Sequence, residues 1–275
     1  MEKQHKVQCY AAPLEGITGY IYRNAHQHIF QGVDKYFTPF VTPKPKKGLN
    51  TREKNDIAPE HNKNIPVVPQ ILTNKAADFI KVAGMMEELG YKEVNLNLGC
   101  PSGTVVSKKK GSGFLADLEG MKYFFDEVFS QVNIEVSVKT RLGVENPDEV
   151  IDLMNVYNAF PISEVIVHAR VREDYYKRPV NQEAFAQCLA ISKHPVCYNG
   201  DLFTAQDIEN LTAKFPDIKA VMLGRGMIAD PQLTEVFCEK EAYGDSISVE
   251  NRQELDYVRW KARSEERRVG KECRS

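Results

Sequence analysis

The feature of this sequence that most restricts its fold is a series of eight short runs rich in β-branched and aromatic residues. Turn residues follow each run, and several of the amphipathic stretches between runs open with a helix-starting signal such as Asn146-Pro147. The runs recur about every 30 residues, the size of one strand–helix–strand unit. The runs span residues 7–13, 35–40, 66–72, 93–100, 135–141, 164–170, 195–201 and 220–226, and the stretches span 74–89, 118–132, 147–160, 181–193 and 204–215.

Eight such units within about 250 residues predict an α/β protein of the (β/α)8 TIM-barrel class. A doubly wound open sheet is the structural alternative, but it rarely needs eight units, and the glycines here cluster after late strands rather than after the first. In a barrel, the site is built at the carboxyl ends of the strands. Nearly every polar or unusual residue of the predicted strands lies at that end, so we expect a functional site there.

The composition excludes several classes of protein. No apolar stretch approaches the roughly 18 residues of a membrane span, and residues 1–6 lack the apolar segment of a secretory signal, so we expect a cytoplasmic protein without membrane contact. Six cysteines without a C-x-x-C pair argue against a disulfide framework or a zinc ribbon, and no histidine cluster has metal-ligand spacing, so we expect no metal ion. No phosphate-binding G-x-x-x-x-G-K-[ST] loop or nucleophile elbow supports an NTPase or a hydrolase.

The last two predicted strands end in Asn199-Gly200-Asp201 and Gly224-Arg225-Gly226. These positions commonly bind phosphate in a barrel, because glycine lets the backbone approach and a guanidinium adds donors of fixed geometry. The alternative is that the glycines only form tight turns, and their occurrence at both expected positions makes it less favourable. The sequence therefore predicts a phosphate site after the last two strands.

Three further strand-end residues have chemical potential. Lys139 and His168 lie at adjacent barrel positions. A buried ammonium group is costly without an anion, so we expect the pair to lie at the rim of a flat, electron-rich cofactor. The alternative is that His168 is a core residue with satisfied hydrogen bonds and that Lys139 has no ligand. Cys100 lies between Gly99 and Pro101 where a strand becomes a loop; an isolated cysteine is usually an inert apolar residue, but this one is placed to be exposed. Its thiol could donate a proton or attack, depending on the substrate.

Several segments together resemble the tRNA-dihydrouridine synthases, the FMN-dependent, bacterial-type family. The resemblance runs from about residue 7 to residue 240, and its most specific part is NLGCPS at 97–102. The other segments are APLEGIT at 12–18, NLNLGCPS at 95–102 as a whole, VKTRLG at 138–143, IVHAR at 166–170 and VMLGRG at 221–226.

The resemblance implies an FMN barrel that uses NADPH as reductant and reduces the C5=C6 bond of specific uridines in tRNA. That bond is conjugated to the C4 carbonyl, so hydride from the reduced flavin adds at C6 and a neutral thiol can protonate C5 from the opposite face. By position, the resemblance assigns Cys100 as the proton donor, Asn97 to the uracil, Pro13, Gln70, Lys139 and His168 to the flavin ring, and Asn199, Gly200, Asp201, Gly224 and Arg225 to the ribityl phosphate.

A uridine in folded tRNA must be turned out of its stack to reach a barrel mouth. Basic clusters follow the predicted strand ends, and we expect them to contact RNA phosphates, although a solvated charged surface remains the alternative for each. The clusters are Lys44, Lys46 and Lys47; Lys108, Lys109 and Lys110; and Arg170, Arg172, Lys177 and Arg178.

The resemblance also sets the expected domains. Residues 1–243 form the barrel, 244–262 begin a largely missing C-terminal helical tRNA-binding domain, and 263–275 (RSEERRVGKECRS) lack apolar periodicity and resemble a non-native tail. We expect a monomer. Two other functions stay open: an FMN barrel acting on a free pyrimidine, similar to dihydroorotate dehydrogenase, and a non-catalytic RNA-binding barrel.

Overall fold

The strands of this protein form one closed parallel sheet. The computed structural model describes residues 7–43 and 48–243. The strand order is β3-β2-β1-β9-β8-β7-β6-β5-β4, and β3 and β4 are consecutive in the chain with only Pro69 between them, so the sheet closes on itself as eight barrel positions. The strands are β1 (Gln8–Ala11), β2 (Lys35–Phe37), β3 (Val67–Val68), β4 (Gln70–Ile71), β5 (Glu93–Asn97), β6 (Glu135–Gly143), β7 (Val165–Val171), β8 (Val196–Asn199) and β9 (Ala220–Leu223).

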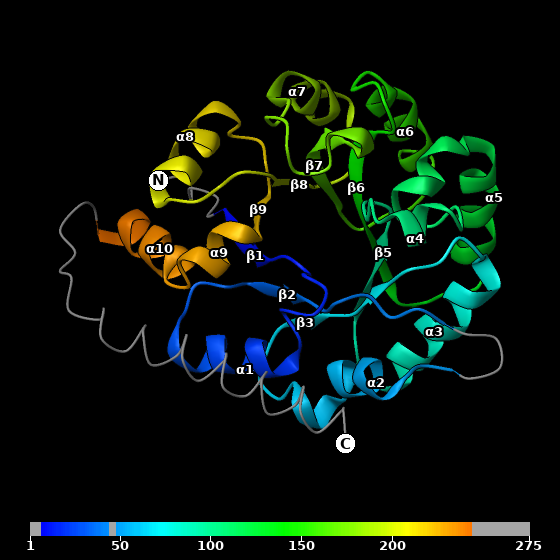
Figure 1. Cartoon of the computed structure of the whole chain (residues 1–275), viewed down its shortest axis with the longest axis horizontal. Coiled ribbons are helices and arrows are strands. Elements are labelled where there is room, and N and C mark those ends of the chain that lie inside the picture. The colour runs from blue at the N-terminus through cyan, green and yellow to red at the C-terminus, as the bar shows by residue number, and fades with distance from the viewer. Residues whose placement is uncertain (1–6, 44–47, 244–275) are drawn as a thin grey trace.

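Helices surround this barrel, as Figure 1 shows, with α1, α3, α5, α6, α7 and α8 around the strands. The expected TIM-barrel class is confirmed, and each predicted run contains a strand. The third run is divided at Pro69, which has no backbone N–H for a sheet ladder. The helices are α1 (Tyr20–Ile29), α2 (Thr51–Ile57), α3 (Ala76–Glu88), α4 (Gly103–Val106), α5 (Leu118–Phe129), α6 (Glu149–Tyr157), α7 (Gln182–Ile191), α8 (Ala205–Lys214), α9 (Arg225–Ala229) and α10 (Leu233–Tyr243), with 3-10 turns η1 (Pro59–His61), η2 (Gly111–Ala116) and η3 (Arg172–Asp174).

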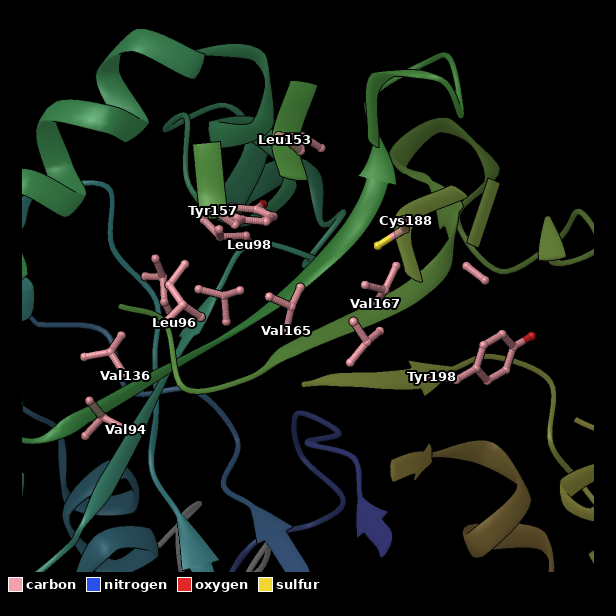
Figure 2. Packing of buried hydrophobic residues seen from close by; sticks show 14 of the residues in the cluster. Val94, Leu96, Leu98, Val136, Leu153, Tyr157, Val165, Val167, Cys188 and Tyr198 are labelled. Atoms are coloured by element: carbon pink, nitrogen blue, oxygen red, sulfur yellow. The ribbon is translucent and has the colours of Figure 1, made fainter. Parts of the chain in front are cut away.

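Strand β5 illustrates how the sequence divides its side chains between two environments. Val94 and Leu96 are fully buried in the main apolar core between strands and helices, where Figure 2 shows them beside Val136 of β6. Asn95 and Asn97 alternate with them and therefore face the barrel interior. The same period of two lets one strand seal the outer core and present polar groups inside.

The barrel interior is part apolar and part polar. A separate cluster of buried apolar side chains fills the side formed mainly by β7, β8, β9, β1 and β2, and hydrogen-bonded polar residues occupy the side formed by β4, β5 and β6. The apolar cluster consists of Tyr10, Ala12, Phe37, Val68, Ile166, Cys197, Ala220 and Met222. The polar side chains on the β4, β5 and β6 side of the interior hydrogen-bond to one another, as buried polar groups require.

Some expectations fall on residues outside the described ranges. These are the helical segment 244–262, the tail 263–275, and the cluster Lys44, Lys46 and Lys47. In residues 7–43 and 48–243, no helix has the length and apolar character needed to span a bilayer.

Candidate functional site

A cavity opens at the carboxyl ends of the strands, and all eight barrel positions contribute to its wall. It brings together residues that are far apart in the sequence, from the loop after β1 to the start of α9. Eleven of the predicted site residues line it: Pro13, Gln70, Asn97, Cys100, Lys139, His168, Asn199, Gly200, Asp201, Gly224 and Arg225. The cavity also contains Ala12, Leu14, Glu15, Pro39, Phe40, Gly99, Arg141, Tyr176, Leu202, Phe203, Met222 and Gly226.

Strand register places the central polar residues side by side. Asn97 of β5 pairs with Lys139 of β6, and His168 of β7 pairs with Arg141 on one side and Asn199 on the other. Because these strands are parallel, their paired residues lie at the same height in the barrel. Two paired rows, Asn97 with Lys139 and Arg141 with His168 and Asn199, therefore contribute polar side chains from four strands to the cavity wall.

Lys139 is a partly buried cation without an anionic partner among the described residues. Its Nζ donates to Asn199 Oδ1 at 2.9 Å, and Asn199 Nδ2 donates onward to the Met222 carbonyl oxygen at 2.8 Å. Burial, with the nearby Arg141 charge, lowers the pKa of Lys139 to about 8. An anion in the cavity would relieve this cost.

His168 is neutral and has a defined tautomer. It is 6% exposed, and burial, together with the neighbouring guanidinium and ammonium groups, lowers its pKa well below the usual value. Arg170 Nη1 lies 3.1 Å from His168 Nε2, and since a guanidinium can only donate, Nε2 accepts and the ring proton is on Nδ1. His168 therefore offers an N–H donor through Nδ1.

Asp201 connects two arginines at the phosphate end of the cavity. Its Oδ1 accepts from Arg225 Nη2 at 2.6 Å, and its Oδ2 accepts from Arg170 Nη2. Arg170 itself does not line the cavity, is 2% exposed, and also donates to the Arg178 carbonyl oxygen. Strand β7 continues to Val171, so Arg170 lies inside the strand, and its contact with a substrate stays a prediction.

The Cys100 thiol remains protonated at neutral pH. Burial raises its pKa, and this effect outweighs the opposing influence of a Ser102 backbone contact and of the Arg141 and Lys139 charges. Its backbone is held at both ends: its N–H donates to Asn97 Oδ1 at 2.9 Å, and its carbonyl oxygen accepts from Ser112 Oγ at 2.9 Å. A fixed, neutral thiol is suited to donating a proton.

A chain of hydrogen bonds runs from the Cys100 loop into the barrel, with each side-chain amide donating to the next residue. Asn97 Nδ2 donates to Gln70 Oε1 at 2.7 Å, and Gln70 Nε2 donates to Asn95 Oδ1 at 2.8 Å. The chain continues from Asn95 Nδ2 to Ser137 Oγ (2.9 Å) and from Ser137 Oγ to Glu93 Oε1 (2.6 Å).

The two ends of this chain fix the orientation of every amide within it. The Gly99 and Cys100 backbone N–H groups can only donate, and both use Asn97 Oδ1; the Glu93 carboxylate, held by Lys35 Nζ at 2.7 Å, can only accept. Asn97 Oδ1 is thus fully used. The group that Asn97 can still offer to the cavity is its second N–H.

Sequence reasoning missed several residues of the cavity wall. Arg141 is 1% exposed and donates to the carbonyl oxygens of Gly99 (2.8 Å), Val171 (2.9 Å) and Tyr175 (3.0 Å), so it ties three loops together. Its position two residues after Lys139 on β6 was a usable signal, because alternate residues share a face. Tyr176 and Phe203 come from loops, where no periodicity reveals them.

The three lysines 108–110 lie outside the cavity, in the turn between α4 and η2. Lys108 and Lys109 are exposed, and Lys110 is half-buried, with burial lowering its pKa. These three lysines lie beside the loop that carries Cys100, and their contact with RNA phosphates stays a prediction.

The cavity fits an anionic flavin nucleotide. Gly200 has φ of 146°, and a Cβ there would lie 2.7 Å from Val180 Cγ1, so the backbone must remain bare. A Cβ on Gly224 would meet Ala12 Cβ at 3.5 Å and would occupy the cavity wall. Bare backbone beside the Arg225 guanidinium suits a phosphate, and the cationic arc around Lys139 suits an electron-rich ring. The described residues contain no group of three or more His, Cys, Asp or Glu side chains placed to hold a metal ion.

Comparison with known proteins agrees with this geometry. The family model described as "Dihydrouridine synthase (Dus)" matches residues 10–272. A tRNA-dihydrouridine(16) synthase of Pseudomonas putida is 28% identical over 235 residues, which cover 82% of this chain and 72% of that protein. The tRNA-dihydrouridine synthase B of Pasteurella multocida is 26% identical over 251 residues, or 90% and 73% of the two chains.

The fold is also similar to that of solved structures. Morphinone reductase superposes with a TM-score of 0.61 at 13% identity, over 84% of this chain and 85% of that chain. At this identity the likeness concerns the barrel alone. The family model covers nearly the whole sequence, and the chain therefore belongs to the dihydrouridine synthase family.

Proposed function

We propose that this chain reduces the C5=C6 bond of specific uridines in tRNA to give 5,6-dihydrouridine, with FMN as the flavin and NADPH as the reductant. One observation carries the proposal: the Cys100 thiol, from the loop after β5, and the Lys139 ammonium group, from β6, open into the same cavity. A proton donor and an anion-stabilising cation are the two groups that reduction of a conjugated C=C bond requires from the protein. The names of the relatives support the choice of tRNA as substrate.

The residues divide into a phosphate end and a ring end. Gly200, Gly224 and Arg225 would hold the ribityl phosphate through backbone N–H groups and the guanidinium, while Asp201 and Asn199 orient their neighbours. Pro13, Gln70, Lys139 and His168 would line the ring, with His168 donating through Nδ1–H. When bound, the flavin supplies the hydride for C6 of the uracil.

Cys100 would complete the reduction by transferring its thiol proton to C5. The raised pKa keeps that proton in place at neutral pH, and two hydrogen bonds fix the backbone of residue 100 beside the cavity. Asn97, whose remaining hydrogen-bonding group is an N–H, would donate to a carbonyl oxygen of the base. These residues thus accept a pyrimidine that presents a carbonyl at that point.

The tRNA would approach across the loops at the carboxyl ends of the strands. Lys108, Lys109 and Lys110 are placed to contact RNA phosphates beside the Cys100 loop. Arg170 would act indirectly, by holding Asp201 and His168 in position.

For the rest of the chain we propose the domain limits given by the sequence: a barrel to residue 243, the beginning of a helical tRNA-binding segment at 244–262, and a non-native tail at 263–275. The family match over 10–272 runs across both limits and includes most of the third segment, so removal of residues 263–275 is the test of the tail. We expect a cytoplasmic monomer.

The deciding experiment uses the full chain with FMN, NADPH and an unmodified tRNA transcript. Dihydrouridine is measured by mass spectrometry of the digested RNA, and its position is mapped in tRNA from a strain that lacks the gene. Dihydrouridine formation that requires both FMN and NADPH is the expected result. Reduction of a free pyrimidine in place of tRNA indicates the dihydroorotate dehydrogenase-like alternative, and tRNA binding without flavin or turnover indicates an RNA-binding barrel.

A further inference from the structure

Three exposed aromatic side chains of the described residues lie on two neighbouring loops, and two of them, Tyr176 and Phe203, line the cavity. Tyr175 and Tyr176 lie on the loop after β7, Phe203 lies on the loop after β8, and they are 45%, 52% and 42% exposed. The other exposed aromatic residue of these ranges, Tyr123, is 73% exposed and lies on α5. Exposing a large apolar ring is unfavourable in water, so its repetition on two neighbouring loops calls for a ligand.

A guanidinium group is associated with two of these rings. Arg225 Cζ lies 5.6 Å from the ring centre of Phe203 and 5.7 Å from that of Tyr176. Its Nη2 is held by Asp201 Oδ1 at 2.6 Å, which fixes the group beside the rings. Aromatic rings with an adjacent guanidinium are the side chains on which nucleobases stack in single-stranded nucleic-acid sites.

The third ring is held outward by a strained backbone. Tyr175 has φ of 51° and ψ of −103°, in the region that favours glycine. Two hydrogen bonds keep it there: its N–H donates to the Arg172 carbonyl oxygen at 3.0 Å, and its carbonyl oxygen accepts from Arg141 Nη1 at 3.0 Å. A buried arginine thus maintains a costly conformation that exposes an aromatic ring, which is typical of a binding loop.

We propose that Phe203 and Tyr175 are base-stacking contacts for the nucleotides that flank the target uridine. This inference rests on the proposed function: a uridine turned into the cavity leaves its neighbours without their stacking partner, and the two loops offer replacement rings at the mouth. Stacking on an aromatic ring is tolerant of base identity, so these contacts would add affinity without restricting the flanking sequence.

The surroundings of the rings favour RNA over an apolar protein partner. Arg178, on the same loop as Tyr175, has a side chain that is 79% exposed, and Arg225 lies between the two aromatic loops. The exposed guanidinium of Arg178 beside these rings matches a phosphate next to stacked bases, while Arg225 faces the phosphate end of the cavity. An apolar protein surface would remove the exposed Arg178 side chain and its ion pair with Asp174 (3.6 Å) from water, which is costly.

The test measures the Kd of the full chain for an unmodified tRNA transcript by filter binding at one fixed salt concentration. Phe203→Ala should weaken binding about tenfold, the scale of one lost base stack. Phe203→Tyr, which keeps the ring, should bind as the parent does, and Phe203→Leu, which keeps only apolar bulk, should resemble alanine. Tyr123→Ala is the matched control and should leave Kd unchanged.

The same comparison applies to Tyr175, where alanine could rearrange the strained loop. Tyr175→Phe should bind as the parent does and Tyr175→Leu should bind more weakly. Kd values for all the Phe203 and Tyr175 variants within twofold of the Tyr123→Ala control would overturn the inference. So would a Phe203→Ala variant that loses FMN affinity in a direct titration but keeps its tRNA affinity, because the ring would then belong to the flavin site.

Failure of the proposed function gives a different pattern. If the parent forms no dihydrouridine but binds tRNA with the predicted sensitivity to Phe203→Leu, the stacking contacts stand and the reaction is wrong. If the parent binds no tRNA, both are refuted.

Discussion

Lys139 gives the sharpest quantitative test of the cavity. Its pKa of about 8 in the unliganded protein means that about nine tenths of the side chains are charged at pH 7 and about one tenth at pH 9. An anionic ligand stabilises the charged form and raises this pKa, so affinity is complete below pH 8 and is lost as the pH rises through it. If only the charged form binds FMN, its affinity should fall about tenfold between pH 7 and pH 9.

The assay is a titration of the apoprotein with FMN at half-unit pH steps. Two variants separate the charge from the shape of the side chain. Lys139→Met should bind FMN more weakly at pH 7 and show little change up to pH 9. Lys139→Arg keeps its charge throughout this range, because a guanidinium titrates above pH 12, and should remove the pH dependence while keeping affinity.

The reasoning would be refuted if the parent and Lys139→Met showed the same pH profile. In that event the loss of affinity would come from another group, and the buried ammonium would not face the anion. A parent profile that stays flat to pH 9 would show that the ammonium keeps its ordinary basicity.

Three further outcomes follow from the site and its supports. Cys100→Ala should keep FMN binding and NADPH oxidation but slow dihydrouridine formation by roughly 10²-fold or more, as measured by single-turnover product analysis. Replacing lysines 108–110 by alanine should weaken tRNA binding and flatten the dependence of log Kd on log salt. Ser137→Ala should lower the free energy of unfolding, measured in urea, by about 1–3 kcal/mol, because Asn95 Nδ2 and Glu93 Oε1 lose their hydrogen-bond partner. The control is Ser163→Ala, which removes a buried hydroxyl that has no hydrogen-bond partner in the described residues and should leave the free energy of unfolding nearly unchanged.

Each of these has a contrary result. Equal product formation by the parent and Cys100→Ala would remove the thiol as the acid. An unchanged salt slope would show that the turn after α4 does not touch the RNA. Equal unfolding midpoints for the two serine variants would mean that the interior hydrogen-bond chain adds no stability.

The strands were predictable because their pattern is local. β-branched runs with polar residues at one end remain visible in a single sequence, and β5 keeps its alternation of Val94 and Leu96 with Asn95 and Asn97. Helices with an apolar face, such as α3 and α5, were visible for the same reason.

Helices α1 and α2 were missed because their buried faces are polar. The buried residues of α1 are Arg23 and His26. Helix α2 buries Glu53 and Asp56 together with Ile57. Arg23 donates to the Asp56 carbonyl oxygen, so the two helices are joined by hydrogen bonds where an apolar stripe is usual. Such polar faces are stable only because the two helices hydrogen-bond to each other in the folded protein. An apolar periodicity in the sequence therefore does not reveal them.

In the candidate site, strand-end position was enough to place Lys139, His168 and Cys100 on one cavity, as the structure has them. Arg170 lies within β7, which ends one residue after the predicted run, and it is not among the residues that line the cavity. Sequence position identified the charge but could not tell a loop residue from one whose guanidinium is enclosed by His168 and Asp201.

The one-way hydrogen-bond chain has a consequence for any attempt to change the base that the cavity accepts. If the remaining Asn97 N–H meets the uracil C4 carbonyl, as an extension of the proposed function, then cytosine, which carries an amino group there, would need an acceptor in its place. Rotating that amide would set its NH2 against the Gly99 and Cys100 N–H groups and its oxygen against Gln70 Oε1. Altered pyrimidine preference would therefore demand coordinated replacements down to Glu93, at the opposite end of β5, and not a single exchange in the cavity wall.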